Sequence, residues 1–163
     1  MSTTAPYGTW PSPITPGTIT TRTVRLSQVR VDGPDTYWVE QRASQAGRNV
    51  LLRRDGDGQI GEILPLTPSD ELVDVRTRVH EYGGRAYAVD SGIVVVSHAG
   101  DGRLYRYDVN HRLRGLVPLT IYGDVRHGDL EIDTGRGLVY AVREDHRGEG
   151  EPVNTLVAIP LDG

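Results

Sequence analysis

The sequence of 163 residues contains no cysteine, no lysine and no phenylalanine. Without cysteine, these residues offer no disulfide bond, no thiolate zinc ligand and no cysteine nucleophile. Without a lysine amine, they support neither Schiff-base catalysis nor phosphate binding by a Walker-type loop. These absences remove several common enzyme chemistries before any motif is considered.

Long apolar runs and blocks of one charge are missing as well. No stretch approaches the roughly 18 apolar residues of a membrane span, and the first residues, MSTTAPYGTWPSPITPG, lack a basic region followed by an apolar one. The net charge is −4, and 18 basic residues, all arginine, are interspersed with 22 acidic ones. We therefore expect a cytoplasmic protein that binds neither membranes nor nucleic acid.

Short strand patterns separated by glycine-containing turns dominate what is present. Runs rich in β-branched and aromatic residues are bounded by pairs such as Asp-Gly and Ser-Gly, which are typical of antiparallel hairpins. The runs form two groups of four and one group of three, over residues 28–33, 36–42, 49–54 and 61–66, then 85–90, 93–99, 103–109 and 115–120, then 129–133, 138–145 and 154–163. Residues 71–79, ELVDVRTRV, alternate in polarity and are predicted to be extended.

The grouping indicates repeated sheets. Aligning the second strand of each group places Tyr37, Val94 and Val139 in register, 57 and 45 residues apart, close to the roughly 40–50 residues of propeller blades. The run IVVVSHA is apolar on both faces, as expected for a sheet packed between two others. We predict an all-β fold, a partial β-propeller of about two and three-quarter four-stranded antiparallel blades.

The predicted domains are an extended lead-in, with Tyr7 and Trp10 as candidate anchors, followed by the partial propeller. Fewer than four blades do not close a ring, so the open sheet faces require further polypeptide or further copies of the chain. The predicted bounds are 1–17 for the lead-in and 18–163 for the propeller, with blade one over about 27–66, blade two over about 85–120 and incomplete blade three over about 128–163.

Several segments resemble the N-terminal propeller of the prolyl oligopeptidase family of serine peptidases, in particular its acylaminoacyl-peptidase and dipeptidyl-aminopeptidase-like bacterial members. They are APYGTWPSPIT, GRNVLLRRDGDG, VRTRVHEYGGRAY, GRLYRYD and DLEIDTGRGLVYAVREDHRGEGEPVNTLVAIPLDG. The resemblance implies a propeller of seven or eight blades that covers a C-terminal α/β-hydrolase domain with a Ser-Asp-His triad. It also implies that the propeller restricts which substrates reach the catalytic serine and favours short peptides.

No catalytic residue is predicted in this chain. A nucleophile elbow needs the pattern G-x-S-x-G, and none of the seven serines lies in one. We therefore expect a non-catalytic propeller part whose partners are short peptides and a hydrolase domain absent from these residues. One alternative is a stand-alone binding or scaffold protein that oligomerises through its open blade faces. A weaker alternative is an independent propeller hydrolase that uses a metal.

Two polar segments supply candidate substrate-binding residues. In RVHEYGGRAY, Arg78, His80, Glu81 and Tyr82 precede a Gly-Gly pair. In one interpretation these residues contact substrate, since a carboxylate can hold a peptide amino terminus and a phenol can donate to a carbonyl. The favoured interpretation is structural: the Gly-Gly pair allows positive φ or close approach where a strand begins. Glu144 and His146 belong to a second polar cluster, which we interpret mainly as a solvated hairpin with arginine-carboxylate pairs.

Two further sequence patterns were considered as cofactor sites, and neither leads us to predict one. GDGQIG, residues 56–61, matches a dinucleotide-binding pattern, but no helix follows it and Asp57 repels a phosphate, so we expect a hairpin turn. The five histidines include no HExxH and no close pair. We predict neither a metal nor another cofactor.

Overall fold

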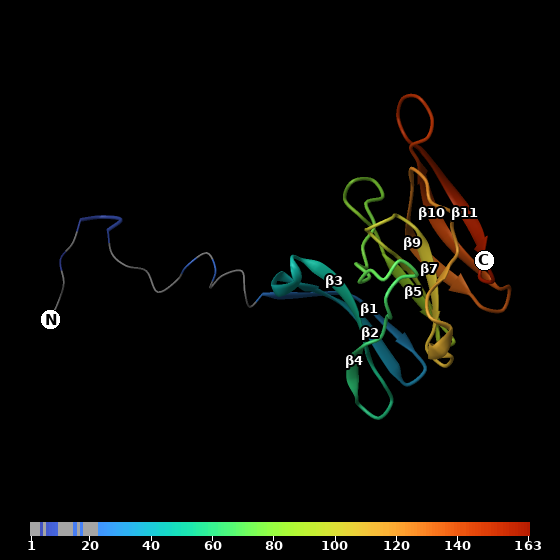
Figure 1. The fold of residues 1–163 in the computed structure, drawn as a ribbon, viewed down its shortest axis with the longest axis horizontal. Helices are drawn as coiled ribbons and strands as arrows, with labels where there is room; N and C mark the ends of the chain where they lie inside the picture. Colours follow the sequence, from blue (N-terminus) through green and yellow to red (C-terminus); the bar gives the residue numbers. More distant parts are fainter. Residues whose placement is uncertain (1–3, 5, 10–14, 16, 18–22) are drawn as a thin grey trace.

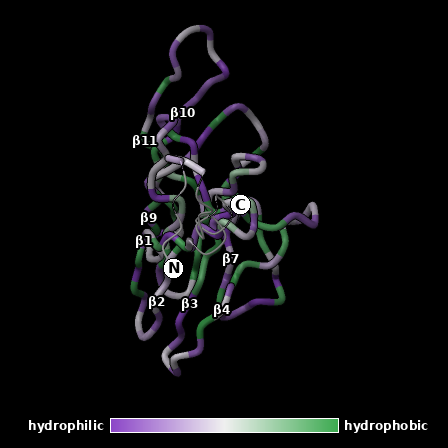
Figure 2. The backbone as a smooth tube through the Cα atoms, turned by 90° about the vertical axis from the view of Figure 1, so that its left-hand side faces the viewer, coloured by the Kyte–Doolittle hydropathy of each residue, from purple (hydrophilic) through white to green (hydrophobic). Residues whose placement is uncertain are grey.

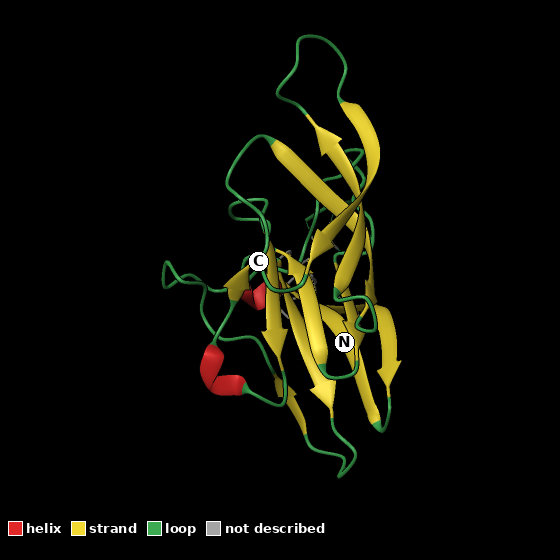
Figure 3. Ribbon diagram, turned by 90° about the vertical axis from the view of Figure 1, so that its right-hand side faces the viewer, coloured by secondary structure: helices red, strands yellow, loops and turns green. Residues whose placement is uncertain are grey.

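The structure is a computed structural model that describes residues 4, 6–9, 15, 17 and 23–163. Three antiparallel sheets follow one another along the chain, two with four strands and one with three (Figure 1). Over the described residues the sheets stay separate and form no closed barrel (Figure 3). The predicted all-β, partial β-propeller fold is confirmed.

Within each sheet, every strand pairs with the next one along the chain. Sheet one contains β1 (Val24–Asp32), β2 (Asp35–Arg42), β3 (Arg48–Arg54) and β4 (Ile60–Glu62). Sheet two contains β5 (Tyr87–Asp90), β6 (Ile93–Ser97), β7 (Leu104–Asp108) and β8 (Val117–Pro118). Sheet three contains β9 (Val125–Asp133), β10 (Leu138–Asp145) and β11 (Val153–Pro160). Two short 3-10 helices, η1 (Ala43–Gln45) and η2 (Arg112–Arg114), lie in loops.

Several strands differ in length from the sequence-based expectation. β1 begins at Val24, earlier than the expected residue 28. β4 ends at Glu62 and β8 spans only Val117–Pro118, so both are shorter than expected. β9 instead begins at Val125, earlier than the expected residue 129. The register of β9 against β10 shifts next to Asp129, whose φ is 52°. This bulge hides the continuous strand from a simple alternation pattern.

Sheet two is packed on both faces. On one face, Val94 and Val96 of β6 join a core with Tyr37 and other residues of sheet one. On the opposite face, Val95 joins a second core with Val139 and other residues of sheet three. This arrangement confirms the interpretation of IVVVSHA as a strand covered from both sides.

Residues 71–79 are extended, as predicted, and fill the gap between sheets one and two. Val73, Val75 and Val79 are buried, as is Thr77, while Arg76 and Arg78 are exposed. Val75 N–H donates to the Asn49 carbonyl in β3 at 2.9 Å, and Val75 forms an isolated bridge with His98. The segment therefore ties the two sheets together at one end.

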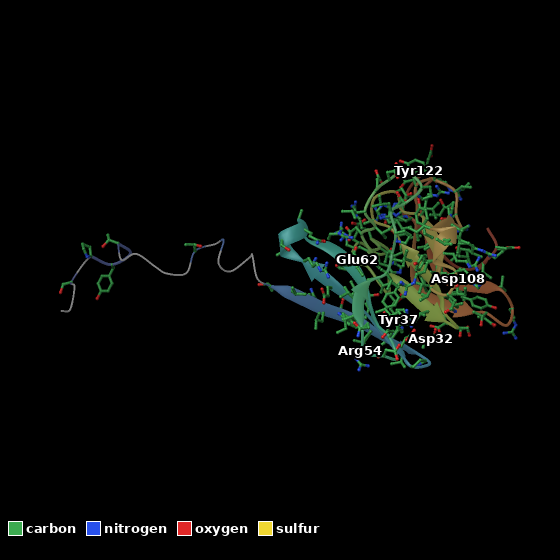
Figure 4. The ribbon with its side chains drawn as sticks, turned by 60° about the horizontal axis from the view of Figure 1, so that its bottom comes forward. Asp32, Tyr37, Arg54, Glu62, Asp108 and Tyr122 are labelled. Carbon is green, nitrogen blue, oxygen red and sulfur yellow. The ribbon has the colours of Figure 1, made fainter. Side chains whose placement is uncertain are left out.

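The sheets have two distinct ends. We call the end at which β2 leads into β3 and β10 into β11 the loop end, and the opposite end, at which β1 turns into β2, the turn end. Tyr122, in a loop of the loop end, and Asp32, at the turn end, lie far apart in Figure 4. The loop between β10 and β11 is mostly hydrophilic (Figure 2).

The lead-in is described only in part. Tyr7 is 96% exposed and thus is not buried against a sheet, and Trp10 lies outside the described residues. Among the residues that the structure describes, no helix has the length and apolar character needed to cross a membrane.

Candidate functional site

The loop end brings together residues that are distant in the sequence. Along the chain, Arg78, His80 and Glu81 come between sheets one and two. Glu144 is the second-to-last residue of β10, and His146 comes directly after that strand. The His80 N–H donates to Glu144 Oε2 at 2.6 Å, across 64 residues of sequence. Both predicted segments therefore meet in one network.

The backbone of the first segment turns sharply at residues 80–83. His80 and Glu81 have φ values of 53° and 61°, and Gly83 has a φ of 80°. The left-handed conformation costs roughly 1 kcal/mol or more for a residue other than glycine. The Glu81 N–H donates to the Arg78 carbonyl and the Gly83 N–H to the Val79 carbonyl, both at 2.9 Å, which holds the turn closed.

The Gly-Gly pair has the structural role that the sequence indicated. A Cβ on Gly83 would lie 2.9 Å from the Thr77 carbonyl oxygen, and a Cβ on Gly84 would lie 3.2 Å from the Asp129 carboxylate. Positive φ at Gly83 and close approach at Gly84 both favour glycine. The pair lets the chain turn out of the 71–79 segment toward β5.

Glu144 is the centre of the network. Its side chain is 5% exposed and accepts hydrogen bonds from the His80 N–H, from Arg126 Nη1 at 3.2 Å and from His146 Nε2. Burial alone raises the pKa of Glu144, but the hydrogen bonds from His146 and His80 and the charge of Arg126 outweigh burial, so the pKa is lowered. Glu144 is therefore an ionised, positioned carboxylate.

Arg126 is the network residue that the sequence analysis missed. It lies opposite Glu144 in the β9–β10 register, and its Nη1 also donates to the Arg78 carbonyl at 3.0 Å and to Glu81 Oε1. The expected start of the strand at residue 129 left Arg126 in a loop. Starting the predicted strand four residues earlier, so that it pairs with β10 along its full length, would have placed Arg126 opposite Glu144.

Glu81 and Tyr82 form the exposed rim of the network. The Glu81 side chain is 65% exposed and Tyr82 is 96% exposed. The hydrogen bond and the charge of Arg126 lower the pKa of Glu81. The rim therefore presents a phenol and an ionised carboxylate that is already paired with a guanidinium.

Two cavities, each of about 450 Å³, flank residues 76–78. One lies between sheets one and two and is lined by Arg25, Arg76 and Arg78 together with Glu81 and Tyr82. The other lies toward sheet three and includes Tyr122 and Arg126. Both have the size of small-ligand sites, roughly 300–1,000 Å³.

The remaining motifs are structural. Asp55 Oδ1 accepts the N–H groups of Asp57 and Gln59, and Gly58 has a φ of 85°, so residues 55–59 form the predicted hairpin turn. In the described part of the chain, no group of three or more His, Cys, Asp or Glu side chains is arranged to hold a metal ion. Glu144 instead has guanidinium, imidazole and N–H partners.

Stacked antiparallel sheets of three or four strands, each made of consecutive strands of the chain, define part of a β-propeller. Over 99% of its length the chain matches the crystal structure of a puromycin hydrolase, at 36% identity and a TM-score of 0.81. A mutant puromycin hydrolase complexed with PGG matches over 98% at 35% identity, with a TM-score of 0.79. A puromycin-hydrolyzing peptidase from Mycobacterium tuberculosis matches over 99% at 36% identity, with a TM-score of 0.76.

The chain spans only 25% of the length of each of these proteins. No family model matches it, and no curated protein does either. The structural matches confirm the resemblance seen in the sequence, because the chain corresponds in sequence and fold to the N-terminal propeller region of a prolyl oligopeptidase-family peptidase.

Proposed function

We propose that this chain is a non-catalytic propeller part of a prolyl-oligopeptidase-type serine peptidase. In this proposal it gates a hydrolase domain outside these residues, so that short peptides reach that domain and larger substrates do not. The observation that carries the proposal is the match over 99% of this chain and 25% of a puromycin hydrolase. A propeller that stands over an active site excludes large substrates by the width of its opening. We further propose a cytoplasmic location, in line with the absence of cysteine.

The loop end supplies the substrate-facing residues of this proposal. Glu81 and Tyr82 are exposed beside a cavity and are suited to contact a peptide, while Arg78 lines the same cavity. Glu144, which is buried, and His146 and His80, which hydrogen bond to it, hold this rim in position. The geometry supports direct contact by the first three residues and positioning by the other three.

Active-site labelling tests the location of the chemistry. The product of the complete gene is treated with a fluorophosphonate, which modifies activated serines, and the labelled peptide is mapped by mass spectrometry. We expect one labelled serine outside residues 1–163, and loss of hydrolysis of puromycin and of aminoacyl anilides. A label on any of the seven serines of this chain, or a gene product without a labelled serine, contradicts the proposal.

Substrate length tests the gating role. We expect kcat/KM of the complete gene product to fall steeply between short peptides and a long unfolded protein. Glu81→Gln and Tyr82→Phe variants are expected to raise KM for peptides with little change in kcat, because they remove binding contacts and leave the reacting groups in place. Equal cleavage of short and long substrates would contradict a gate.

A second candidate function is a scaffold that completes its ring by association of copies. The exposed apolar residues of the outer sheets favour it, since Leu26 and Val31 of β1 are 63% and 70% exposed and Leu156 of β11 is 77% exposed. Sedimentation of the purified chain discriminates the two. A ring-sized oligomer supports the scaffold, and a monomer removes it.

A further inference from the structure

The cavity between sheets one and two has an unusual balance of charge. It is lined by three guanidinium groups, those of Arg25, Arg76 and Arg78, and by a single carboxylate, that of Glu81. Arg76 and Arg78 alternate with buried neighbours along the extended segment, so both side chains point away from the core. Arg25 comes from the start of β1, on the facing sheet.

The guanidinium groups of this cavity are largely without partners. Over the residues that the structure describes, Arg25 and Arg76 make no side-chain hydrogen bond or ion pair, and Arg78 reaches only Glu81, at 3.9 Å. Most other arginines of the sheets are paired, as Arg53 is with Asp35 at 2.6 Å and Arg48 with Glu62 at 2.9 Å. The arginines of this cavity therefore lack the close carboxylate partners that most other arginines of the sheets have.

The nearby acids are engaged by other groups. Glu81 Oε1 accepts from Arg126, which lies outside this cavity and offsets part of the charge of Glu81. The Asp74 Oδ1 atom, on the same segment, accepts from the Asn49 N–H at 2.9 Å and from Asn49 Nδ2 at 2.8 Å. The cavity thus keeps a surplus of positive charge and donors.

We infer that the cavity between sheets one and two binds a carboxylate group of a peptide. Planar guanidinium groups donate paired hydrogen bonds that match a carboxylate, and a cavity of about 450 Å³ has room for a few residues of peptide backbone. The Gln41 amide and the Tyr82 phenol line the same cavity and offer polar contacts to that backbone. The inference rests on the proposed function only in taking peptides as the ligand class.

Titration of the complete gene product with three peptides tests the inference, with calorimetry as the readout. Treatment with the fluorophosphonate beforehand prevents hydrolysis of the peptides. The peptides are tri-alanine, its C-terminal amide, and Ala-Asp-Ala amide. We expect tri-alanine to bind at least about tenfold more tightly than its amide, the change for one lost charge-assisted contact of about 1.4 kcal/mol. Recovery of binding by Ala-Asp-Ala amide would assign the site to an acidic side chain as well as to a C-terminus.

Variants locate the site. Arg76→Gln and Arg25→Gln are each expected to weaken tri-alanine binding by about tenfold, whereas Arg114→Gln, an exposed arginine of η2 outside the cavity, leaves it unchanged. Circular dichroism checks that each variant is folded. Equal binding of tri-alanine and its amide, no binding of any of the three peptides, or no effect of either cavity variant overturns the inference.

The outcome is separable from that of the proposed function. The titration needs no catalysis, so a complete gene product that cleaves peptides without any preference for a free carboxylate removes only this inference. Conversely, carboxylate binding by a chain whose gene encodes no hydrolase domain removes only the proposed peptidase role.

Discussion

Sheet two and the two sheets beside it differ in what covers their faces. In sheet two, Val94 and Val95 point to opposite sides and are both 0% exposed. In sheet three, Val139 on the covered face is 0% exposed, whereas Leu156 in the adjacent strand β11 is 77% exposed. Strands of similar composition thus end up buried or exposed according to their neighbours, and we expect each sheet to gain stability from the one beside it.

The same contrast appears in one aspartate at the turn end of each sheet, where the first strand ends. Asp32 accepts the Ser91 and Gly92 N–H groups at 3.1 and 2.7 Å, and Asp90 accepts the Thr134 N–H and hydroxyl at 3.1 and 2.6 Å. These two aspartates therefore bond to the turn of the next sheet.

Asp133 occupies the same position in sheet three but turns to its own hairpin. It accepts the Arg136 N–H at 2.9 Å and Arg136 Nη1 at 2.6 Å. An equivalent residue thus joins two sheets where a neighbour is present and closes a local turn where the described chain supplies none.

The largest expected effect comes from truncating matched leucines on covered and open faces. Leu104 is 0% exposed between sheets two and three, whereas Leu156 is 77% exposed. We expect Leu104→Ala to lower the free energy of unfolding by about 2–5 kcal/mol and Leu156→Ala to change it by less than about 0.5 kcal/mol, measured by urea unfolding. Similar losses would show that the two faces are equally covered.

A smaller effect concerns His127, which is 6% exposed in β9. Burial, reinforced by the nearby Arg143 charge, lowers the pKa of His127 to about 4, from 6.5. Between these values the unfolded chain binds a proton that the folded chain does not. Stability is therefore expected to fall by on the order of 2–3 kcal/mol as the pH drops from 6.5 to about 4.

Urea unfolding across this pH range checks the expectation, with His127→Gln as the test variant and His111→Gln, whose side chain is 65% exposed, as the control. The test variant should lose most of the pH dependence that the control keeps. An equal slope in both variants would mean that His127 is accessible to protons in the folded chain.

The smallest effect separates the aspartates of the turn end. Asp90→Asn weakens hydrogen bonds to the next sheet and is expected to cost about 1 kcal/mol, while Asp133→Asn disturbs only an exposed turn and should cost less than Asp90→Asn. Thermal unfolding of both variants measures the difference. A larger loss of stability for Asp133→Asn than for Asp90→Asn would contradict the distinction between aspartates that bond to the next sheet and those that bond to their own turn.

The sequence predicted the strands better than it predicted the joints between them. Alternation and turn residues located the eleven strands found in the described part of the chain, and the two-sided apolar run identified β6 as a covered strand. The bulges at Gln28 and Asp129, with φ values of 55° and 52°, were not foreseen, because neither residue is a glycine. Gln28 nevertheless accepts the Ala86 N–H at 2.8 Å and so fixes sheet one on sheet two.

The candidate site was predicted as two separate segments. Residue types marked His80 and Glu144 as notable, but their hydrogen bond depends on how sheet three packs beside the 71–79 segment, which local patterns do not encode. Arg126 was missed for the related reason that its strand appeared to begin after it. Local chemistry was therefore readable from sequence, and convergence in space was not.

The hydrogen bond from His80 to Glu144 also has a consequence during synthesis on the ribosome. The left-handed turn at His80 and Glu81 is joined by this bond to a carboxylate that is made 64 residues later. A nascent chain that has released only its first two sheets therefore lacks Glu144, and water is the partner left for the His80 N–H until β10 emerges and docks.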